Sequence, residues 1–84
     1  MVYTKEAARQ LSKLRKRDQQ IAIRIVRVIE AMSLDPFAGD VKRLKNVSSY
    51  RRRVGDWRII FNVFGDTLVV EIIAIDHRRQ IYRK

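Results

Sequence analysis

The sequence predicts a single α+β domain over residues 1–84, in which two helices cover one face of a small, mainly antiparallel, twisted sheet. Residues 5–34 show the apolar spacing of amphipathic helices. Residues 50–75 alternate apolar and polar side chains around two Gly-Asp dipeptides, which is typical of β-hairpins. Helices that precede consecutive strands pack against one face of the sheet. The expected order is therefore strand, helix, helix and three strands.

Residues 1–3 are long enough only for a short edge strand, and two amphipathic helices follow, over residues 5–16 and 18–34. Thr4 and Asp18 are predicted N-caps, because their side chains accept hydrogen bonds from the first helical turn. The apolar positions that recur with helical spacing are Ala7, Leu11 and Leu14 in the first helix, and Ile21, Ile25, Val28, Ile29 and Met32 in the second. These two stripes predict a two-helix hairpin packed on the sheet.

The first Gly-Asp dipeptide, Gly55-Asp56, predicts a two-residue hairpin turn, because Gly adopts the positive φ that such a turn requires. This turn pairs Arg53 with Arg58, and the alternation of strand side chains puts Arg51 on the same face. Like charges directly opposite each other destabilise a sheet. Three arginines on one face therefore indicate a site for an anion.

The second dipeptide, Gly65-Asp66, predicts another two-residue turn, between strands over residues 57–64 and 67–75. The predicted pairs on the core face are Val63 with Leu68, Phe61 with Val70, Ile59 with Ile72 and Trp57 with Ala74. Those on the opposite face are Asn62 with Val69, Ile60 with Glu71 and Arg58 with Ile73. In this register Ile75 and His77 lie on the face of Arg58.

The composition argues against metal and cofactor chemistry and favours a polyanionic partner. The chain has no Cys and one His, so we expect no disulfide, no metal site and no cofactor. The formal net charge of +10 over 84 residues favours a polyanionic partner, nucleic acid ahead of a membrane. No apolar run reaches the roughly 20 residues that span a bilayer, and no signal peptide opens the chain. We expect a cytoplasmic protein.

The candidate catalytic residues are Arg51, Arg53, Arg58, His77, Arg78 and Tyr82. Arginine binds phosphate through bidentate hydrogen bonds and stays charged. Histidine transfers protons near neutral pH, and tyrosine stacks on bases or transfers a proton. With RNA, such a set suits attack of a 2′-hydroxyl on the adjacent phosphate without a metal ion.

Two motifs, YRRRVGDWRIIFNV and IAIDHRRQIYRK, together with the element order, resemble the RelE/ParE superfamily of type II toxin–antitoxin toxins. The resemblance covers nearly the whole chain. For RelE-like members it implies a ribosome-dependent endoribonuclease that cuts mRNA in the A site and is neutralised by a small antitoxin, such as a RelB-like protein, in a complex that can be oligomeric. It implies an enzyme that inhibits translation.

The resemblance also implies roles for single residues. Arg51 and Arg53 match positions that bind the scissile phosphate, and Arg58 matches an arginine placed for transition-state charge. Arg78 matches the basic residue of the C-terminal motif, and Tyr82 its terminal tyrosine, which orients the target nucleotide. His77 falls where relatives have lysine or histidine, so a proton-transfer role is expected. The residues expected to bind RNA or the ribosome are Lys42, Arg43, Lys45, Arg52, Arg79 and Arg83.

Two other functions fit the same sequence. ParE-like members of the superfamily inhibit DNA gyrase, although they generally lack the basic cluster with a terminal tyrosine. A nucleic-acid-binding module without catalysis would also carry this charge.

Arg52 departs from the family pattern, because the alternation of the strand places this charged residue on the core face. Its side chain either reaches past the strand edge or the strand bulges there. An antitoxin segment is expected on the arginines or on their apolar neighbours Ile60, Val69 and Ile73.

Overall fold

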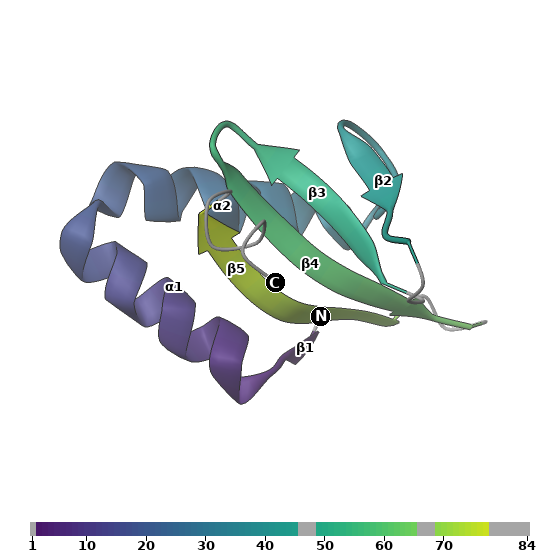
Figure 1. The fold of residues 1–84 in the computed structure, drawn as a ribbon, viewed down its shortest axis with the longest axis horizontal. Coiled ribbons are helices and arrows are strands. Elements are labelled where there is room, and N and C mark those ends of the chain that lie inside the picture. Colours follow the sequence, from purple (N-terminus) through teal and green to yellow (C-terminus); the bar gives the residue numbers. More distant parts are fainter. Residues whose placement is uncertain (1, 46–48, 66–68, 78–84) are drawn as a thin grey trace.

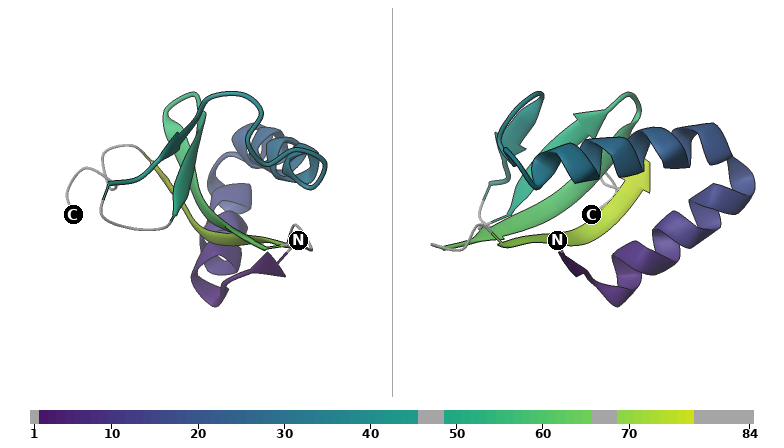
Figure 2. Two further views of the ribbon diagram at one scale, coloured as in Figure 1. Left: turned by 90° about the vertical axis from the view of Figure 1, so that its right-hand side faces the viewer. Right: turned by 180° about the vertical axis from the view of Figure 1, so that it is seen from behind.

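The computed structural model describes residues 2–45, 49–65 and 69–77. Two helices lie on one side of a five-stranded sheet and meet at one end in an open V (Figure 1, Figure 2). The opposite side of the sheet carries none of the described helices (Figure 2). This arrangement confirms the α+β class predicted from the sequence.

The helices form where the apolar spacing predicts them. Helix α1 spans Lys5–Arg17 and helix α2 spans Gln19–Met32. The side chain of Thr4 accepts a hydrogen bond from the amide of Ala7 at 3.1 Å, and Asp18 does the same for Ile21 at 3.2 Å. Both predicted N-caps are confirmed. Because Asp18 alone separates the two helices, the chain turns sharply between them.

The sheet has the strand order β1-β5-β4-β3-β2. Its strands are β1 (Val2–Tyr3), β2 (Val41–Arg43), β3 (Tyr50–Val54), β4 (Trp57–Phe64) and β5 (Val69–His77). Only β1 pairs in parallel, with β5. Strand β2 was not predicted, since three residues are too short for a clear alternation, and it forms by pairing with β3 along one edge.

The core lies between the helices and the sheet. Each helix supplies its apolar stripe, with Leu11 and Leu14 from α1 and Ile25 and Ile29 from α2 buried. The fully buried residues of the central strand are Ile59 and Phe61. Burying a large apolar side chain contributes about 1.5–3 kcal/mol to stability, so this layer holds both helices on one face of the sheet. The other face is not covered by the described helices.

The two hairpins differ in register. The β3–β4 register matches the prediction, and Gly55 has a φ of 60° in the turn. The predicted β4–β5 register is wrong, because Phe64 pairs with Val69 and a four-residue connection replaces the expected two-residue turn. A bulge follows, since Phe61 pairs with Ile72 while Ile60 pairs with Ala74. Ile73 is the extra residue, and it reverses the facing of every later β5 residue.

Candidate functional site

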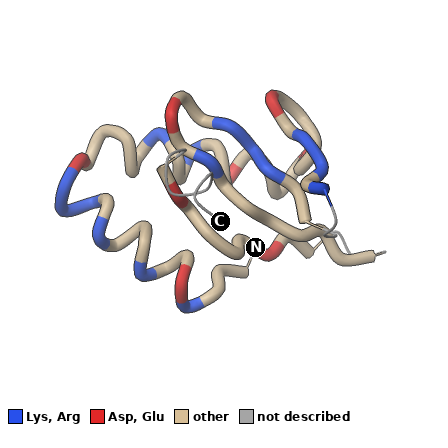
Figure 3. The backbone as a smooth tube through the Cα atoms, viewed as in Figure 1, with Lys and Arg blue, Asp and Glu red and all other residues tan. Residues whose placement is uncertain are grey.

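Three arginines lie on the sheet face opposite the helices, and we call them the arginine face: Arg51, Arg53 and Arg58. Arg53 pairs with Arg58 across the β3–β4 hairpin, and Arg51 pairs with Ile60 in the same register. Side chains two residues apart on a strand share a face, so the three guanidinium groups point to one side. This confirms the predicted arrangement, and Figure 3 shows the run of basic residues along β3.

The three arginines differ in exposure. Arg58 is buried, with only 5% of its surface exposed, whereas Arg53 is exposed. The Arg51 side chain is 12% exposed, and its Nη1 lies 3.5 Å from Oδ1 of Asp40. A buried charge is costly unless it is compensated. The arginine face thus combines one buried guanidinium group, that of Arg58, with one that is accessible to solvent, that of Arg53.

The residue opposite Arg58 on β5 is Asp76 and not Ile73 as predicted, and the prediction that His77 lies on the face of Arg58 is wrong. The bulge at Ile73 shifts the parity, so His77 pairs with Trp57 instead. The rings of His77 and Trp57 meet edge to face, with centroids 5.4 Å apart. Directly opposite residues have Cβ atoms about 4.5–5.5 Å apart, which puts the Asp76 carboxylate within reach of the Arg58 guanidinium.

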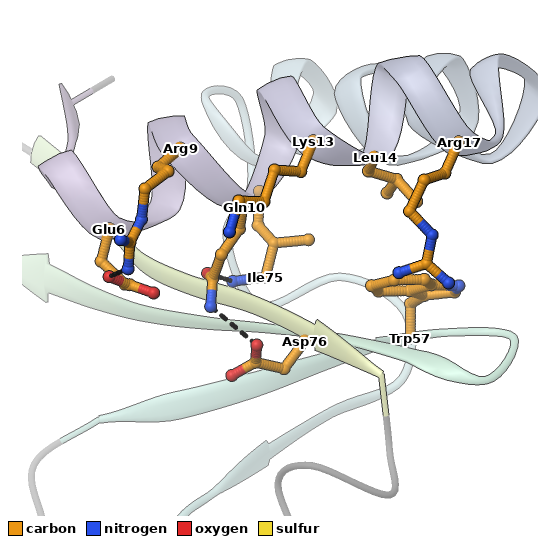
Figure 4. Close-up of a pocket in the computed structure, with 9 residues that line it drawn as sticks. All are labelled: Glu6, Arg9, Gln10, Lys13, Leu14, Arg17, Trp57, Ile75 and Asp76. Carbon is orange, nitrogen blue, oxygen red and sulfur yellow. Dashed lines mark hydrogen bonds and ion pairs between the residues drawn. The ribbon is translucent and has the colours of Figure 1, made fainter.

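Helix α1 fixes Asp76 through Gln10 (Figure 4). The side-chain amide of Gln10 donates from Nε2 to Oδ1 of Asp76 at 2.7 Å. Its Oε1 accepts a hydrogen bond from the amide of Ile75 at 2.6 Å, on the edge of β5 beyond its pairing with β1. Sequence analysis missed both Gln10 and Asp76. The available signal was the place of Gln10 beside Leu11 and Leu14 on the inward flank of the helix.

A family profile described as the ParE toxin of the type II toxin-antitoxin system, parDE, matches residues 1–82. The chain belongs to this family. It is a type II toxin with a RelE-like fold, as the sequence motifs indicated. Comparison with curated proteins found no significant match.

Solved structures agree with this assignment. The toxin resembles RelE in the RelB–RelE antitoxin–toxin complex from Methanococcus jannaschii, with 26% identity and a TM-score of 0.77 over 98% of this chain and 95% of that one. The YoeB/ParE toxin from Agrobacterium tumefaciens is 22% identical, with a TM-score of 0.80 over 90% and 94% of the two chains. The toxin–antitoxin complex RelBE2 from Mycobacterium tuberculosis matches with 26% sequence identity and a TM-score of 0.72, over 90% of this chain and 93% of that one.

Arg52 lies apart from the arginine face of the toxin. It pairs with Ile59 and Val41, so it points to the helix side, and no bulge occurs in β3. Its guanidinium reaches past the strand edge to Gly39, where an added Cβ would lie 2.8 Å from the Arg52 Cζ. The first of the two predicted explanations is therefore the one observed.

The other predicted binding residues divide between two regions. Lys42 and Arg43 lie exposed on edge strand β2, with Lys42 paired to Arg51, and Lys45 is exposed after this strand. The predicted site residues outside the described residues are Arg78, Arg79, Tyr82 and Arg83. Within the described ranges, no group of three or more His, Cys, Asp or Glu side chains is placed to hold a metal ion. No described helix of the toxin is long and apolar enough to cross a membrane.

Proposed function

We propose that this toxin is an mRNA endoribonuclease that acts in the cytoplasm, cuts mRNA in the ribosomal A site and so inhibits translation. The observation that carries the proposal is the arginine face, where Arg53 and Arg58 are directly paired and Arg51 lies beside them. Such pairing destabilises a protein that has no anion to bind. A phosphate of the RNA backbone supplies that anion.

The proposed reaction breaks the bond between phosphorus and the 5′-oxygen of the next nucleotide. The 2′-oxygen attacks the phosphate, a base accepts its proton, and an acid protonates the leaving 5′-oxygen. Arg53 and Arg51 bind the phosphate, and Arg58 stabilises the negative charge that develops on it. Tyr82 remains a predicted proton-transfer residue, whereas His77 pairs with Trp57, on the face opposite the arginines. The reaction needs no metal ion, since guanidinium groups neutralise the phosphate.

We further propose that a small antitoxin neutralises the toxin. The similar toxins from Methanococcus jannaschii and Mycobacterium tuberculosis were crystallised as toxin–antitoxin complexes, and a YoeB–YefM complex from Staphylococcus aureus is heterotetrameric. Half-buried Ile60 and Ile73 lie near the arginines, so an acidic, amphipathic segment fits this surface. A crystal structure of the complex tests this proposal, and an antitoxin that touches only the outer helix surfaces would contradict it.

A second candidate is inhibition of DNA gyrase, which the ParE description of the matching family favours. A ribosome-free supercoiling assay with purified gyrase separates the two functions. Inhibition of supercoiling together with intact mRNA would replace the endoribonuclease proposal by this one.

The deciding experiment maps cleavage of a reporter mRNA by primer extension, in a reconstituted translation reaction and again without ribosomes. We expect cuts in phase with codons that require ribosomes. Arg53→Ala and Arg58→Ala should each reduce the cleavage rate by about 10²–10³, the usual cost of losing one transition-state donor. Arg53 is exposed, so its variant reports on activity even if loss of buried Arg58 impairs folding. Arg27→Ala, on the outside of α2, is the matched control and should cleave normally.

A further inference from the structure

A cleft of about 210 Å³ lies between α1 and the end of the sheet where β4 begins and β5 ends. Figure 4 shows α1 side chains along one wall and Trp57, Ile75 and Asp76 on the other. Two carboxylates line the cleft, but each already has a partner. Glu6 pairs with Arg9, and Asp76 accepts the hydrogen bond from Gln10.

Three cations follow this wall at intervals of four residues, and we call them the α1 ridge: Arg9, Lys13 and Arg17. Four helical residues advance about 6 Å along the axis, and residues at this spacing lie on one side of the helix. All three are exposed. No described carboxylate forms an ion pair with Lys13 or Arg17. The ridge is thus cationic toward the C-terminal end of α1 (Figure 3).

An aromatic surface lies beside this end of the ridge. The Arg17 side chain points toward the indole of Trp57 (Figure 4), and Trp57 in turn contacts His77 edge to face. A guanidinium that lies on an aromatic ring keeps its in-plane N–H groups available for phosphate. Aromatic rings beside a cationic groove are the usual platform for single-stranded nucleic acid.

The cleft and the arginine face meet at the same end of the sheet. Trp57 and Arg58 are consecutive, so one lines the cleft while the other belongs to the arginine face. Arg24 of α2 also lies close, since a Cβ added to Gly55 at the hairpin tip would be 3.7 Å from its Nη1. One strand of nucleic acid passing around this tip can touch both surfaces.

We propose that the α1 ridge and Trp57 form a second RNA-binding surface, which holds backbone phosphates of single-stranded RNA outside the site of cleavage. The inference rests on RNA as the proposed ligand, but it does not depend on cleavage. Lys13 and Arg17 contribute the phosphate contacts, and Trp57 contributes the stacking surface.

The test measures binding of fluorescently labelled, fully 2′-O-methylated single-stranded RNA by anisotropy over a range of salt concentrations. This RNA has no 2′-hydroxyl, so it binds without being cut. The double variant Lys13→Gln/Arg17→Gln should lower the slope of log K against log salt by about 1.4, since each phosphate contact on a single strand contributes about 0.7.

The matched control is Lys5→Gln/Arg15→Gln, which removes one Lys and one Arg from the same helix. Both are exposed, and Arg15 lines a different cavity, with Tyr3 and Val26. Arg15 and Arg17 both belong to the last turn, so the loss of either arginine changes the interaction with the helix dipole alike, whereas Lys5 lies in the first turn. The control should change the slope by less than half as much, with thermal unfolding checked for both variants.

Equal slopes for the two double variants would mean that the α1 ridge is only a solvated helix face, and would overturn the inference. Absence of RNA binding by the wild type would overturn it as well. If the wild type binds RNA through the ridge but leaves mRNA intact in the translation reaction, the second surface stands and the endoribonuclease proposal fails.

Discussion

The β3–β4 and β4–β5 hairpins share strand β4 but are connected and paired differently. Two residues separate the paired Val54 and Trp57 in the first hairpin, whereas four separate Phe64 and Val69 in the second. The first register is regular, and the second contains the bulge at Ile73. A tight turn fixes the register from the turn outward, while a longer connection leaves it to be fixed by packing.

This difference determines what each hairpin contributes to the surface. The regular first hairpin places three arginines on one face. The bulged second hairpin buries Val70 and Ile72 before the bulge and Ile75 after it, on the same core face. A regular strand would turn Ile75 outward, since its parity is opposite to that of Ile72. The bulge therefore fills the core and brings Asp76 opposite Arg58.

The largest predicted effect separates the two registers of β5. Ile75 is 2% exposed, so Ile75→Ala should lower the free energy of unfolding by about 2–5 kcal/mol. Ile73 is half-buried and has no cross-strand partner on β4, so Ile73→Ala should cost about 1 kcal/mol or less. Urea denaturation of the two variants measures both values. Equal, small losses at Ile73 and Ile75, which share the arginine side of the sheet in the regular register, would support that register instead.

The sequence predicts the first hairpin because its rules are local. Gly55 in the turn, the alternation around it and the N-caps Thr4 and Asp18 act within a few residues. The second hairpin is different, since residues 72–75 are all apolar and their alternation carries no parity. Only packing against the helices selects the bulge there.

The candidate site follows the same division. The arginine face needed only the first turn, and it was predicted. The contact between Gln10 and Asp76 joins residues 66 positions apart, on a helix flank and a strand edge. It depends on the bulge and on the placement of α1, neither of which a single sequence fixes. The placement of His77 on the face of Arg58 was assigned from parity, so it shared the error in the register.

The next prediction concerns the support that the second hairpin receives from α1. Gln10→Ala removes two hydrogen bonds from the edge of β5, and it should lower the free energy of unfolding by about 1–3 kcal/mol. Hydrogen exchange at the Ile75 amide should accelerate by more than this global loss explains. Gln20→Ala, at an exposed position of α2, should change stability by less than about 0.5 kcal/mol. Equal effects of the two variants would exclude Gln10 as an anchor for β5.

The smallest predicted effect lies at Tyr3, which pairs with Ile72 next to the bulge. Burial raises the pKa of the Tyr3 phenol, and Glu30 adds to this while Arg15 opposes it. The unfolded chain therefore loses this proton first, at a pKa of about 10, and the folded toxin loses stability as the pH rises from there toward the higher folded pKa. Tyr3→Phe removes that loss. The difference in the free energy of unfolding between wild type and variant should therefore change as the pH rises above about 10, compared with its value at neutral pH. Parallel urea denaturation curves across this range measure the difference. A constant gap between the two proteins would show that Tyr3 ionises alike in both states, and that the β1–β5 pairing does not bury its hydroxyl.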